Sequence, residues 1–401
     1  MATKLITVAE ARARVLERVT PLSSEPQSVS DALGRVLAAD VLAAGDVPRF
    51  PSSAMDGYAI HAGPAGRRLT LAGESRAGRP AGHTLGDGEA IRISTGAAVP
   101  EGATAVIPQE DVDADRADVL TRAEVRPGQN IRVPGEDMRA GSAILTTGRI
   151  LGGVELGAIA TAGLGRVAVA QRPRVAVLCT GDELRAPGEP LGPGEIHNSN
   201  APMLTGLAAS AGAQTGAAQR LPDDRAATRT GIATALESSD VVLISGGVSV
   251  GPHDHVKPVL ADLGVEEVFW SVALQPGKPT WFGTSGDGRL VFGLPGNPVS
   301  AVVTFSLFVS PALAALQGAH PVASLEATAV LGVQVRRNPR REQAIRVRLK
   351  RGDGPPVATP NGAQGSHVLT SLIGADALAM VPAGEGTLPV GAAVALEALA
   401  S

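Results

Sequence analysis

The stretch Asp240–Asp254, DVVLISGGVSVGPHD, decides the fold of this chain. It begins with the apolar run 241–245, which ends at Gly246-Gly247 and a loop that leads to Asp254. A continuous β-branched run closed by glycines is typical of a buried parallel strand that ends in a loop. Ligands of open α/β sheets bind at the carboxyl ends of such strands. We therefore expect an α/β domain with a ligand site at this loop.

The same loop has the composition of a phosphate site. Glycine lets the backbone approach a ligand closely, and consecutive free N–H groups can hold phosphate oxygens. A carboxylate just after the loop, here Asp254, is well placed to hold Mg²⁺ on those phosphates. The alternative is a tight turn followed by a surface aspartate, because glycine loops after strands are common.

Composition limits the class of protein. The 401 residues suggest about two to four domains, and 44% hydrophobic with 18% charged residues is typical of a soluble globular protein. A net charge of −4 gives no bulk attraction to nucleic acid or anionic membrane, so neither is an expected partner. The single cysteine, Cys179, cannot form an intrachain disulfide. The start of the chain has no apolar leader, and we see no uncharged apolar run approaching the ~18 residues of a membrane span. We expect a cytoplasmic protein.

The first half of the chain predicts helices around a β-rich insertion. A capping box at Thr7–Glu10 opens a helix that runs to Val19, and a second short helix is expected over 31–42. From 55 to 137, short alternating runs are separated by glycine and proline turns, as in a small β domain. A helix over 151–162 and a strand over 166–170 follow.

Strands and helices then alternate from Pro173 to Gly318, which implies a parallel sheet with helices on both faces. The expected strands are 174–179, 214–221, 241–245, 265–272 and 290–293, and the expected helices are 202–211, 224–236, 256–263 and 298–316. After Gly318 the alternation returns to a period of two. We expect a compact β barrel or sandwich there.

Carboxylates follow three successive strands of the predicted sheet. Glu183 comes after the first strand, Asp223 after the second and Asp254 after the third. Each alone is more often a helix cap or turn former. Together, however, like charges at one sheet edge need a compensating cation, and Mg²⁺ prefers a few carboxylates plus phosphate. The set predicts a metal and phosphate site.

Two further loops offer groups for an anion. Lys278 lies in the rigid turn PGKP, which suits a fixed cation, and Gly296-Asn297 opens the long helix, whose first N–H groups can face an anion. A surface lysine and an ordinary helix start are the alternatives. His253 and His255 flank Asp254, but this spacing is a weak indication of a metal site. No Ser/His/Asp triad is identifiable, and Cys179 at a buried strand end is expected to be structural.

The assembled motifs resemble the MoeA-type molybdopterin molybdenumtransferases, the family that includes the E domain of gephyrin. The motifs occur in the order SSAMDGYA, STGA, PGEDM, TGDEL, SGGVSVGPHD, PGKP, LPGNPVS and QGSH across essentially the whole chain. Each motif is weak alone, whereas eight in order are specific.

The resemblance implies an α/β multidomain homodimer. The expected domains are a discontinuous helical linking domain (1–51 and 138–171), a β-rich inserted domain (52–137), a MogA-like α/β domain (172–318) and a C-terminal β barrel (319–401). It also implies insertion of molybdenum from molybdate into adenylylated molybdopterin, with Mg²⁺ and with release of AMP. A molybdopterin adenylyltransferase and apo-molybdoenzymes are conceivable partners.

The resemblance also assigns residues. The expected catalytic positions are Asp56, Thr95, Asp137, Glu183, Asp223, Asp254 and Lys278, with Mg²⁺ held among Glu183, Asp223 and Asp254. The expected ligand contacts are Thr180, Gly181, Ser245, Gly246, Gly247, Ser249, Gly251, Pro295, Gly296, Asn297, Arg341, Ser366 and Ser371. Because Asp56 and Asp137 belong to the inserted domain, the family's dimer would bring one subunit's insertion to the other subunit's α/β site.

The chain departs from the family before PGKP. Many relatives carry lysines where this chain has Ser271 and Gln275, and two missing cations weaken attraction for a dianion by roughly 1 kcal/mol each. Arg341 and Arg346 are candidates to compensate. Two other functions stay open at this point: a molybdopterin-binding carrier or scaffold without insertion activity, and a molybdopterin adenylyltransferase, although the latter proteins lack the β-rich insertion and the C-terminal domain.

Overall fold

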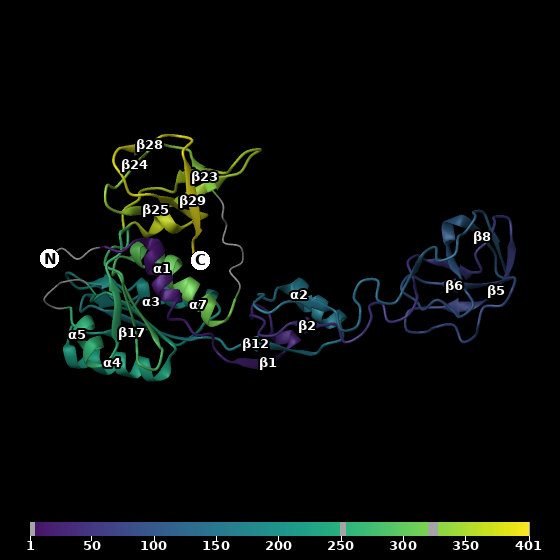
Figure 1. Ribbon diagram of the computed structural model, residues 1–401, viewed down its shortest axis with the longest axis horizontal. Helices are drawn as coiled ribbons and strands as arrows, with labels where there is room; N and C mark the ends of the chain where they lie inside the picture. Colours follow the sequence, from purple (N-terminus) through teal and green to yellow (C-terminus); the bar gives the residue numbers. More distant parts are fainter. Residues whose placement is uncertain (1–4, 249–253, 320–327, 401) are drawn as a thin grey trace.

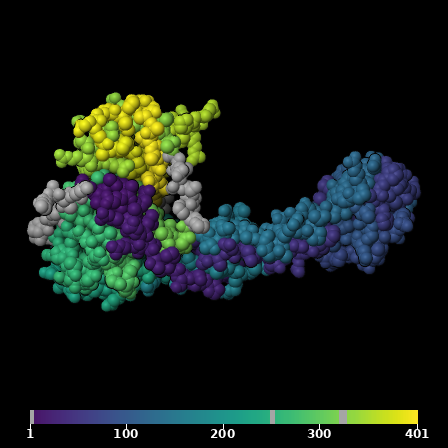
Figure 2. Space-filling model, in the orientation of Figure 1, coloured from purple at the N-terminus to yellow at the C-terminus, as the bar shows by residue number. Residues whose placement is uncertain are grey.

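The computed structural model describes residues 5–248, 254–319 and 328–400. Figure 1 shows an elongated molecule. The α/β domain and the C-terminal barrel are stacked at one end, a narrow linking domain forms the middle, and the β-rich inserted domain lies at the far end. The space-filling view in Figure 2 shows the same narrow neck between the two ends.

The α/β domain contains a sheet in the order β16-β13-β18-β22-β21-β19, with β17 also paired to β13. Its strands are β13 (Arg174–Thr180), β16 (Gln214–Thr215), β17 (Gln219–Leu221), β18 (Val241–Ser245), β19 (Glu266–Trp270), β21 (Trp281–Thr284) and β22 (Leu290–Leu294). The neighbours of β13, and the pair β18 and β22, are parallel, as predicted. β21 was not predicted, and it makes the far edge of the sheet antiparallel.

Helices cover both faces of this sheet. They are α3 (Asn200–Ser210), α4 (Arg225–Ser238), α5 (Val256–Asp262), α6 (Pro298–Thr304) and α7 (Ser310–Leu316), with the π-helical turn Phe305–Val309 between the last two. The N-terminal helix α1 (Val8–Leu16) also packs here, because Val8, Ala11 and Val15 belong to the same apolar core. The prediction had placed this helix with the linking domain.

The prediction that the chain contains no uncharged apolar run of nearly membrane-spanning length was wrong. The continuous helical segment Pro298–Leu316 has 19 residues and a mean hydropathy of 2.0. However, 78% of its apolar window is buried inside the molecule. Its apolar side chains therefore serve the core of the α/β domain, which contains residues from both flanking helices and from the π-helical turn.

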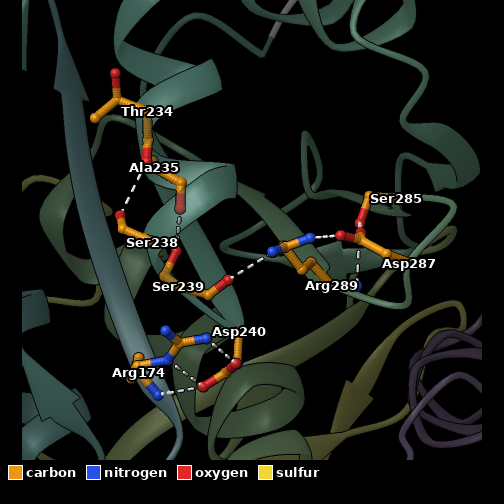
Figure 3. Close-up of polar contacts among 9 residues, drawn as sticks. All are labelled: Arg174, Thr234, Ala235, Ser238, Ser239, Asp240, Ser285, Asp287 and Arg289. Carbon is orange, nitrogen blue, oxygen red and sulfur yellow. Dashed lines mark hydrogen bonds and ion pairs between the residues drawn. The ribbon is translucent and has the colours of Figure 1, made fainter.

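Polar contacts fix the amino end of β18, at the edge of the sheet opposite the glycine loop (Figure 3). The Asp240 carboxylate accepts hydrogen bonds from the Arg174 backbone N–H at 2.8 Å, from Nη2 at 2.8 Å and from Nε at 3.2 Å. Arg289 donates from Nε to the Ser239 carbonyl at 3.1 Å. Burial alone would raise the pKa of Asp240, but the hydrogen bonds from Arg174 outweigh it and hold that pKa below its ordinary value. Asp240 thus aligns the starts of β13 and β18.

We predict that Asp240→Asn lowers the free energy of unfolding of the α/β domain by about 1–3 kcal/mol, because the partly buried carboxylate of Asp240 loses the charge that accepts three hydrogen bonds from Arg174. Both tryptophans, Trp270 and Trp281, lie in this sheet, so urea unfolding can be followed by their fluorescence. The exposed pair of Asp262 with Arg225 supplies a control, Asp262→Asn, expected to change stability by less than about 1 kcal/mol.

The pH dependence has a definite sign. A lowered pKa in the folded state stabilises the protein fully above the unfolded value, near 3.8, and this contribution is lost as the pH falls through the folded value. The difference between wild type and Asp240→Asn should therefore be constant near neutral pH and shrink below about pH 4. A difference that grows on acidification would contradict this assignment.

The inserted domain has a sheet in the order β7-β4-β6-β5-β9-β8. Its strands are β4 (Gly57–Ile60), β5 (Arg68–Ser75), β6 (Glu89–Ile93), β7 (Ala105–Pro108), β8 (Val112–Ala114) and β9 (Asp118–Thr121), with the pair β3 (Ser52–Ser53) and β10 (Ile131–Arg132) at its base and the 3-10 turn Gln109–Asp111 after β7. The predicted β-rich insertion is therefore present.

The linking domain consists of two strand pairs and one helix. They are β1 (Ser24–Ser28) with β12 (Arg166–Ala170), β2 (Val41–Leu42) with β11 (Ala143–Leu145), and α2 (Gly153–Thr161). The helix predicted over 31–42 was wrong. A 3-10 turn ends at Asp31, Gly34 has a φ of +72°, and the Leu37 N–H pairs with the Arg149 carbonyl rather than within a helix.

The C-terminal domain is a closed five-stranded barrel, since β25 pairs with both β26 and β27 and the others close the ring. Its strands are β23 (Thr328–Leu331), β25 (Glu342–Lys350), β26 (Val357–Pro360), β27 (Ala377–Val381) and β29 (Ala393–Ala398), and outside the ring β24 (Val335–Arg336) pairs with β28 (Thr387–Leu388). The short strand β20 (Leu274–Gln275) extends from the α/β domain and pairs with β25. This pairing joins the barrel to the loop that carries PGKP.

Candidate active site

A cavity of about 660 Å³ lies at the carboxyl ends of β13, β18 and β22. Its wall also includes the short parallel pair β14 (Leu184–Arg185) and β15 (Ile196–His197), the start of α3 and one barrel residue, His367. The predicted site residues that line it are Thr180, Gly181, Glu183, Asp223, Ser245, Gly246, Gly247, Asp254, Gly296 and Asn297. Residues from five separate stretches of sequence thus share one cavity.

The glycine loop requires glycine at two positions. Gly246 has a φ of +90° and Gly247 of +66°, a region that L side chains rarely adopt. A Cβ at Gly246 would lie 2.7 Å from Thr180 Oγ1, and one at Gly247 would lie 2.7 Å from Val256 Cγ2. The loop therefore exposes its backbone directly to the cavity. The predicted contacts Ser249 and Gly251, and His253 beside them, lie outside the described residues.

The three carboxylates predicted to hold a metal line the same cavity. Asp223 is fixed beside the turn after β13, because its backbone N–H donates to Asp182 Oδ1 at 3.3 Å and its Oδ2 accepts the Asp182 N–H at 3.4 Å. The Glu183 carboxylate lies against Gly181, where an added Cβ would be 2.4 Å from Oε2. Over 5–248, 254–319 and 328–400, no three His, Cys, Asp or Glu side chains are grouped closely enough to hold a metal alone. A cation here needs additional oxygens from a ligand.

Asn200 is a site residue that the sequence prediction missed. Its side chain is 8% exposed, and Nδ2 donates to Ser245 Oγ and to the Gly296 carbonyl, both at 2.7 Å. The amide therefore ties the ends of β18 and β22 to the start of α3. Its Oδ1 has no hydrogen-bond partner among the described residues. The stretch NSN between a strand and a helix was the available indication.

The start of the long helix is shared with the barrel. The Val299 N–H donates to the Ser366 carbonyl at 3.2 Å, and Asn297 Nδ2 donates to Ser366 Oγ at 3.3 Å. Ser366 thus contacts a cavity residue without lining the cavity itself, and it occupies one of the helix N–H groups expected to face an anion. Pro295 is buried just before this turn.

Three other predicted residues lie near the junction with the barrel and away from the cavity wall as the structure describes it. Lys278 is exposed, and its carbonyl accepts the Val272 N–H at 3.0 Å. The Arg341 N–H donates to Asn338 Oδ1 at 3.0 Å, and Asn338 Nδ2 donates to Gln275 Oε1 at 2.6 Å. Ser371 is 3% exposed and accepts a hydrogen bond from Arg346 Nε at 3.1 Å.

Arg346 is the buried cation of this junction. Its side chain is 1% exposed, and Nη2 donates to the carbonyls of Ala363 at 3.3 Å and Gly365 at 3.2 Å. Burial lowers the pKa of Arg346 to about 10. Within the described ranges no carboxylate pairs with it, so its charge is balanced only by carbonyl and hydroxyl oxygens.

The remaining predicted catalytic residues lie in the arm, as we call the linking domain and the inserted domain together. The Asp56 carboxylate accepts a hydrogen bond from the Thr95 backbone N–H at 2.7 Å and another from the Thr95 hydroxyl at 3.1 Å. The motifs SSAMDGYA and STGA are therefore in direct contact. Asp137 is exposed, and its N–H donates to the Val47 carbonyl at 3.0 Å. Figure 1 shows β5, β6 and β8 of the inserted domain at the opposite end of the molecule from β17 and the other elements of the α/β domain, which contains the cavity. One chain does not bring these groups to Asp254.

Cys179 has no sign of a reactive thiol. It is 1% exposed at the end of β13, and burial raises its pKa. A protonated, enclosed thiol is a poor nucleophile.

Family models match nearly the whole chain. The MoeA N-terminal region (domains I and II) matches residues 6–163, a probable molybdopterin-binding domain matches 176–315, and the MoeA C-terminal region (domain IV) matches 328–399. The first segment covers α1, most of the linking domain and the inserted domain, the second lies in the α/β domain, and the third lies in the barrel.

Curated relatives and solved structures agree with these matches. The molybdopterin molybdenumtransferase of Haemophilus influenzae is 35% identical over 98% of both chains, and molybdopterin molybdenumtransferase 2 of Mycobacterium tuberculosis is 37% identical over 88% of this chain and 90% of its own. The crystal structure of the molybdopterin biosynthesis MoeA protein from Pyrococcus horikoshii OT3 has a TM-score of 0.84 at 30% identity, covering 98% of this chain and all of that one. The chain therefore belongs to the MoeA family of molybdopterin molybdenumtransferases, enzymes of molybdenum cofactor biosynthesis.

Proposed function

We propose that this protein inserts molybdenum from molybdate into adenylylated molybdopterin and releases AMP in a Mg²⁺-dependent reaction. The observation that carries the proposal is one cavity in which a glycine loop and three carboxylates, Glu183, Asp223 and Asp254, meet at the carboxyl edge of a parallel sheet. A backbone loop for phosphate oxygens beside hard oxygen ligands suits a phosphoanhydride substrate.

The donor set fits Mg²⁺. Glu183, Asp223 and Asp254 would offer it carboxylate oxygens, and because these residues are not grouped closely enough to hold a metal alone, phosphate oxygens of the substrate would have to provide further ligands. Mg²⁺, when bound there, would supply neutralisation of the negative charge on the phosphates. The chain's own contribution is to hold the phosphates on Gly246 and Gly247 and to keep the carboxylates at their edge.

Attraction for molybdate comes from the junction with the barrel in this proposal. Ser271, where many relatives have lysine, is 2% exposed, and Gln275 bonds to Asn338. The buried charge of Arg346, without a carboxylate partner in the described part of the chain, compensates for those cations. The donors of Arg346 are bonded to hydroxyl and carbonyl oxygens, which carry no full negative charge, so its positive charge still attracts an oxyanion at the junction.

The active form is a homodimer in this proposal. Asp56 and Thr95 lie just before β4 and just after β6 of the inserted domain, which is at the opposite end of the molecule from the α/β domain, so a second subunit is needed to bring such a pair to the cavity. An apolar surface for the contact is available on the linking domain, where Leu33, Ile150 and Val154 are 61%, 44% and 84% exposed. We propose a cytoplasmic location, with the adenylyltransferase and apo-molybdoenzymes as transient partners.

Lys278→Ala is predicted to weaken binding of molybdate or nucleotide by about threefold to tenfold, because an exposed cation contributes about 1 kcal/mol. The measurement is equilibrium binding of each ligand. Lys350→Ala, an exposed lysine at the end of a barrel strand, is the matched control and should bind both normally. Equal affinities for wild type and Lys278→Ala would remove this residue from the site.

The function is tested by incubating purified protein with adenylylated molybdopterin, Mg²⁺ and molybdate and measuring molybdenum bound to the pterin. Transfer of metal is the expected result. Tight binding of the nucleotide without transfer would instead indicate a carrier, and the positions of Ser271 and Gln275 would be the first to change to lysine.

A further inference from the structure

The cavity wall offers a phosphate no lysine or arginine side chain among the described residues. It contains the three carboxylates predicted to hold a metal. Beside side-chain amides and hydroxyl donors such as Thr180 and Ser199, the wall contains two imidazoles, those of His197 and His367, whose ring N–H groups can donate to a phosphate.

These two histidines differ in their hydrogen bonds. His197 Nε2 lies 3.0 Å from the Glu189 carbonyl and is committed to its own loop. The His367 ring makes no hydrogen bond or ion pair within residues 5–248, 254–319 and 328–400, although its side chain is exposed at the cavity. His367 therefore has both ring nitrogens available to a ligand.

The loop that carries His367 is fixed from both sides. Toward the barrel, Arg346 Nη2 donates to the Gly365 carbonyl, and the Arg346 N–H donates to Gln364 Oε1 at 3.0 Å. Toward the α/β domain, Ser366 is bonded to Val299 and Asn297. A loop held at the two residues before His367 places the imidazole reproducibly.

Gly365 leaves room for the ring. A Cβ at this position would lie 2.9 Å from His367 Cε1 and 3.3 Å from Nδ1. The imidazole therefore lies against its own loop, at the mouth of the cavity that Asn297 also lines.

We propose that His367 donates an N–H to a phosphate oxygen of the ligand in this cavity, which makes it the barrel's contribution to substrate binding. This inference rests on the proposed function, since it takes the ligand to be a phosphate ester or anhydride. In addition to attracting molybdate, the buried Arg346 then has a second role, because it holds the loop that contains His367.

The test is titration calorimetry of AMP with Mg²⁺, and of adenosine as the ligand without phosphate. His367→Phe keeps a planar ring and removes the donor, and it should weaken AMP binding about tenfold or more while leaving adenosine binding unchanged. His367→Gln, which restores an N–H donor, should recover most of the loss. His83→Phe, at an exposed histidine of the inserted domain that does not line the cavity, is the matched control and should bind AMP within about twofold of wild type.

The outcomes separate this inference from the proposed function. AMP bound equally by wild type and His367→Phe, or equal losses of AMP and adenosine, would overturn the phosphate contact and leave the nucleotide site standing. Failure of the wild-type protein to bind AMP at all would overturn both.

Discussion

Asp254→Asn is expected to reduce AMP release from adenylylated molybdopterin by about 100-fold or more, with little change in stability. Asp254 lines the cavity at the end of the glycine loop, beside Glu183 and Asp223. The substitution removes one negative charge from a group proposed to hold a cation on the phosphates. Deleting a preorganised polar group of this kind costs roughly 3 kcal/mol of transition-state stabilisation. The measurement is the initial rate at saturating molybdate over a range of Mg²⁺ concentrations.

If Asp254 holds Mg²⁺, its replacement also changes how the rate depends on the Mg²⁺ concentration. The variant should need more Mg²⁺ for half-maximal rate, which a merely structural residue would not. Asp262→Asn, in α5 and paired with Arg225 on the surface, is the control and should keep the wild-type rate. A wild-type rate and Mg²⁺ requirement in Asp254→Asn would remove Asp254 from the site.

Two inactive variants are expected to complement each other when they share a dimer. Asp56→Asn damages the Asp56–Thr95 pair at the end of the arm, and Asp254→Asn damages the cavity. If each site takes its cavity from one subunit and its arm from the other, co-expressed chains restore one intact site in each mixed dimer. Random pairing then gives about a quarter of the wild-type activity.

The control pairs Asp254→Asn with Glu183→Gln. Both changes fall in the same cavity, so each site of a mixed dimer still carries one of them. This mixture should stay at background activity. Restoration in both mixtures, or in neither, would refute a site divided between subunits in the proposed way.

The cavity was predictable because its members follow the strands of one parallel sheet. Glu183 follows β13, Asp223 follows β17 and Asp254 follows β18, and parallel strands bring their carboxyl ends to one edge. The glycines of the loop were predictable for the same reason, and their positive φ angles agree.

Other features depend on contacts far apart in the sequence. Asn200 bonds to residues 45 and 96 positions away, so the stretch NSN around it does not show which residues its side chain contacts. His367 enters the cavity only because the barrel loop packs on the start of α6. The prediction of a helix over 31–42 was wrong because backbone hydrogen bonds between 34–37 and 149–151 outweigh the local helix propensity. β21 has the sequence WFGT, which shows no alternation of apolar and polar residues. Its antiparallel pairing with β22 could therefore not be predicted.

AMP release from adenylylated molybdopterin, measured with Mg²⁺ in the presence and absence of molybdate, tests the central claim most directly. The account predicts slow release without molybdate and rapid release with it, accompanied by one molybdenum bound for each AMP released. AMP release that is equally fast without molybdate, or metal binding without AMP release, would contradict the claim that this cavity couples the two events.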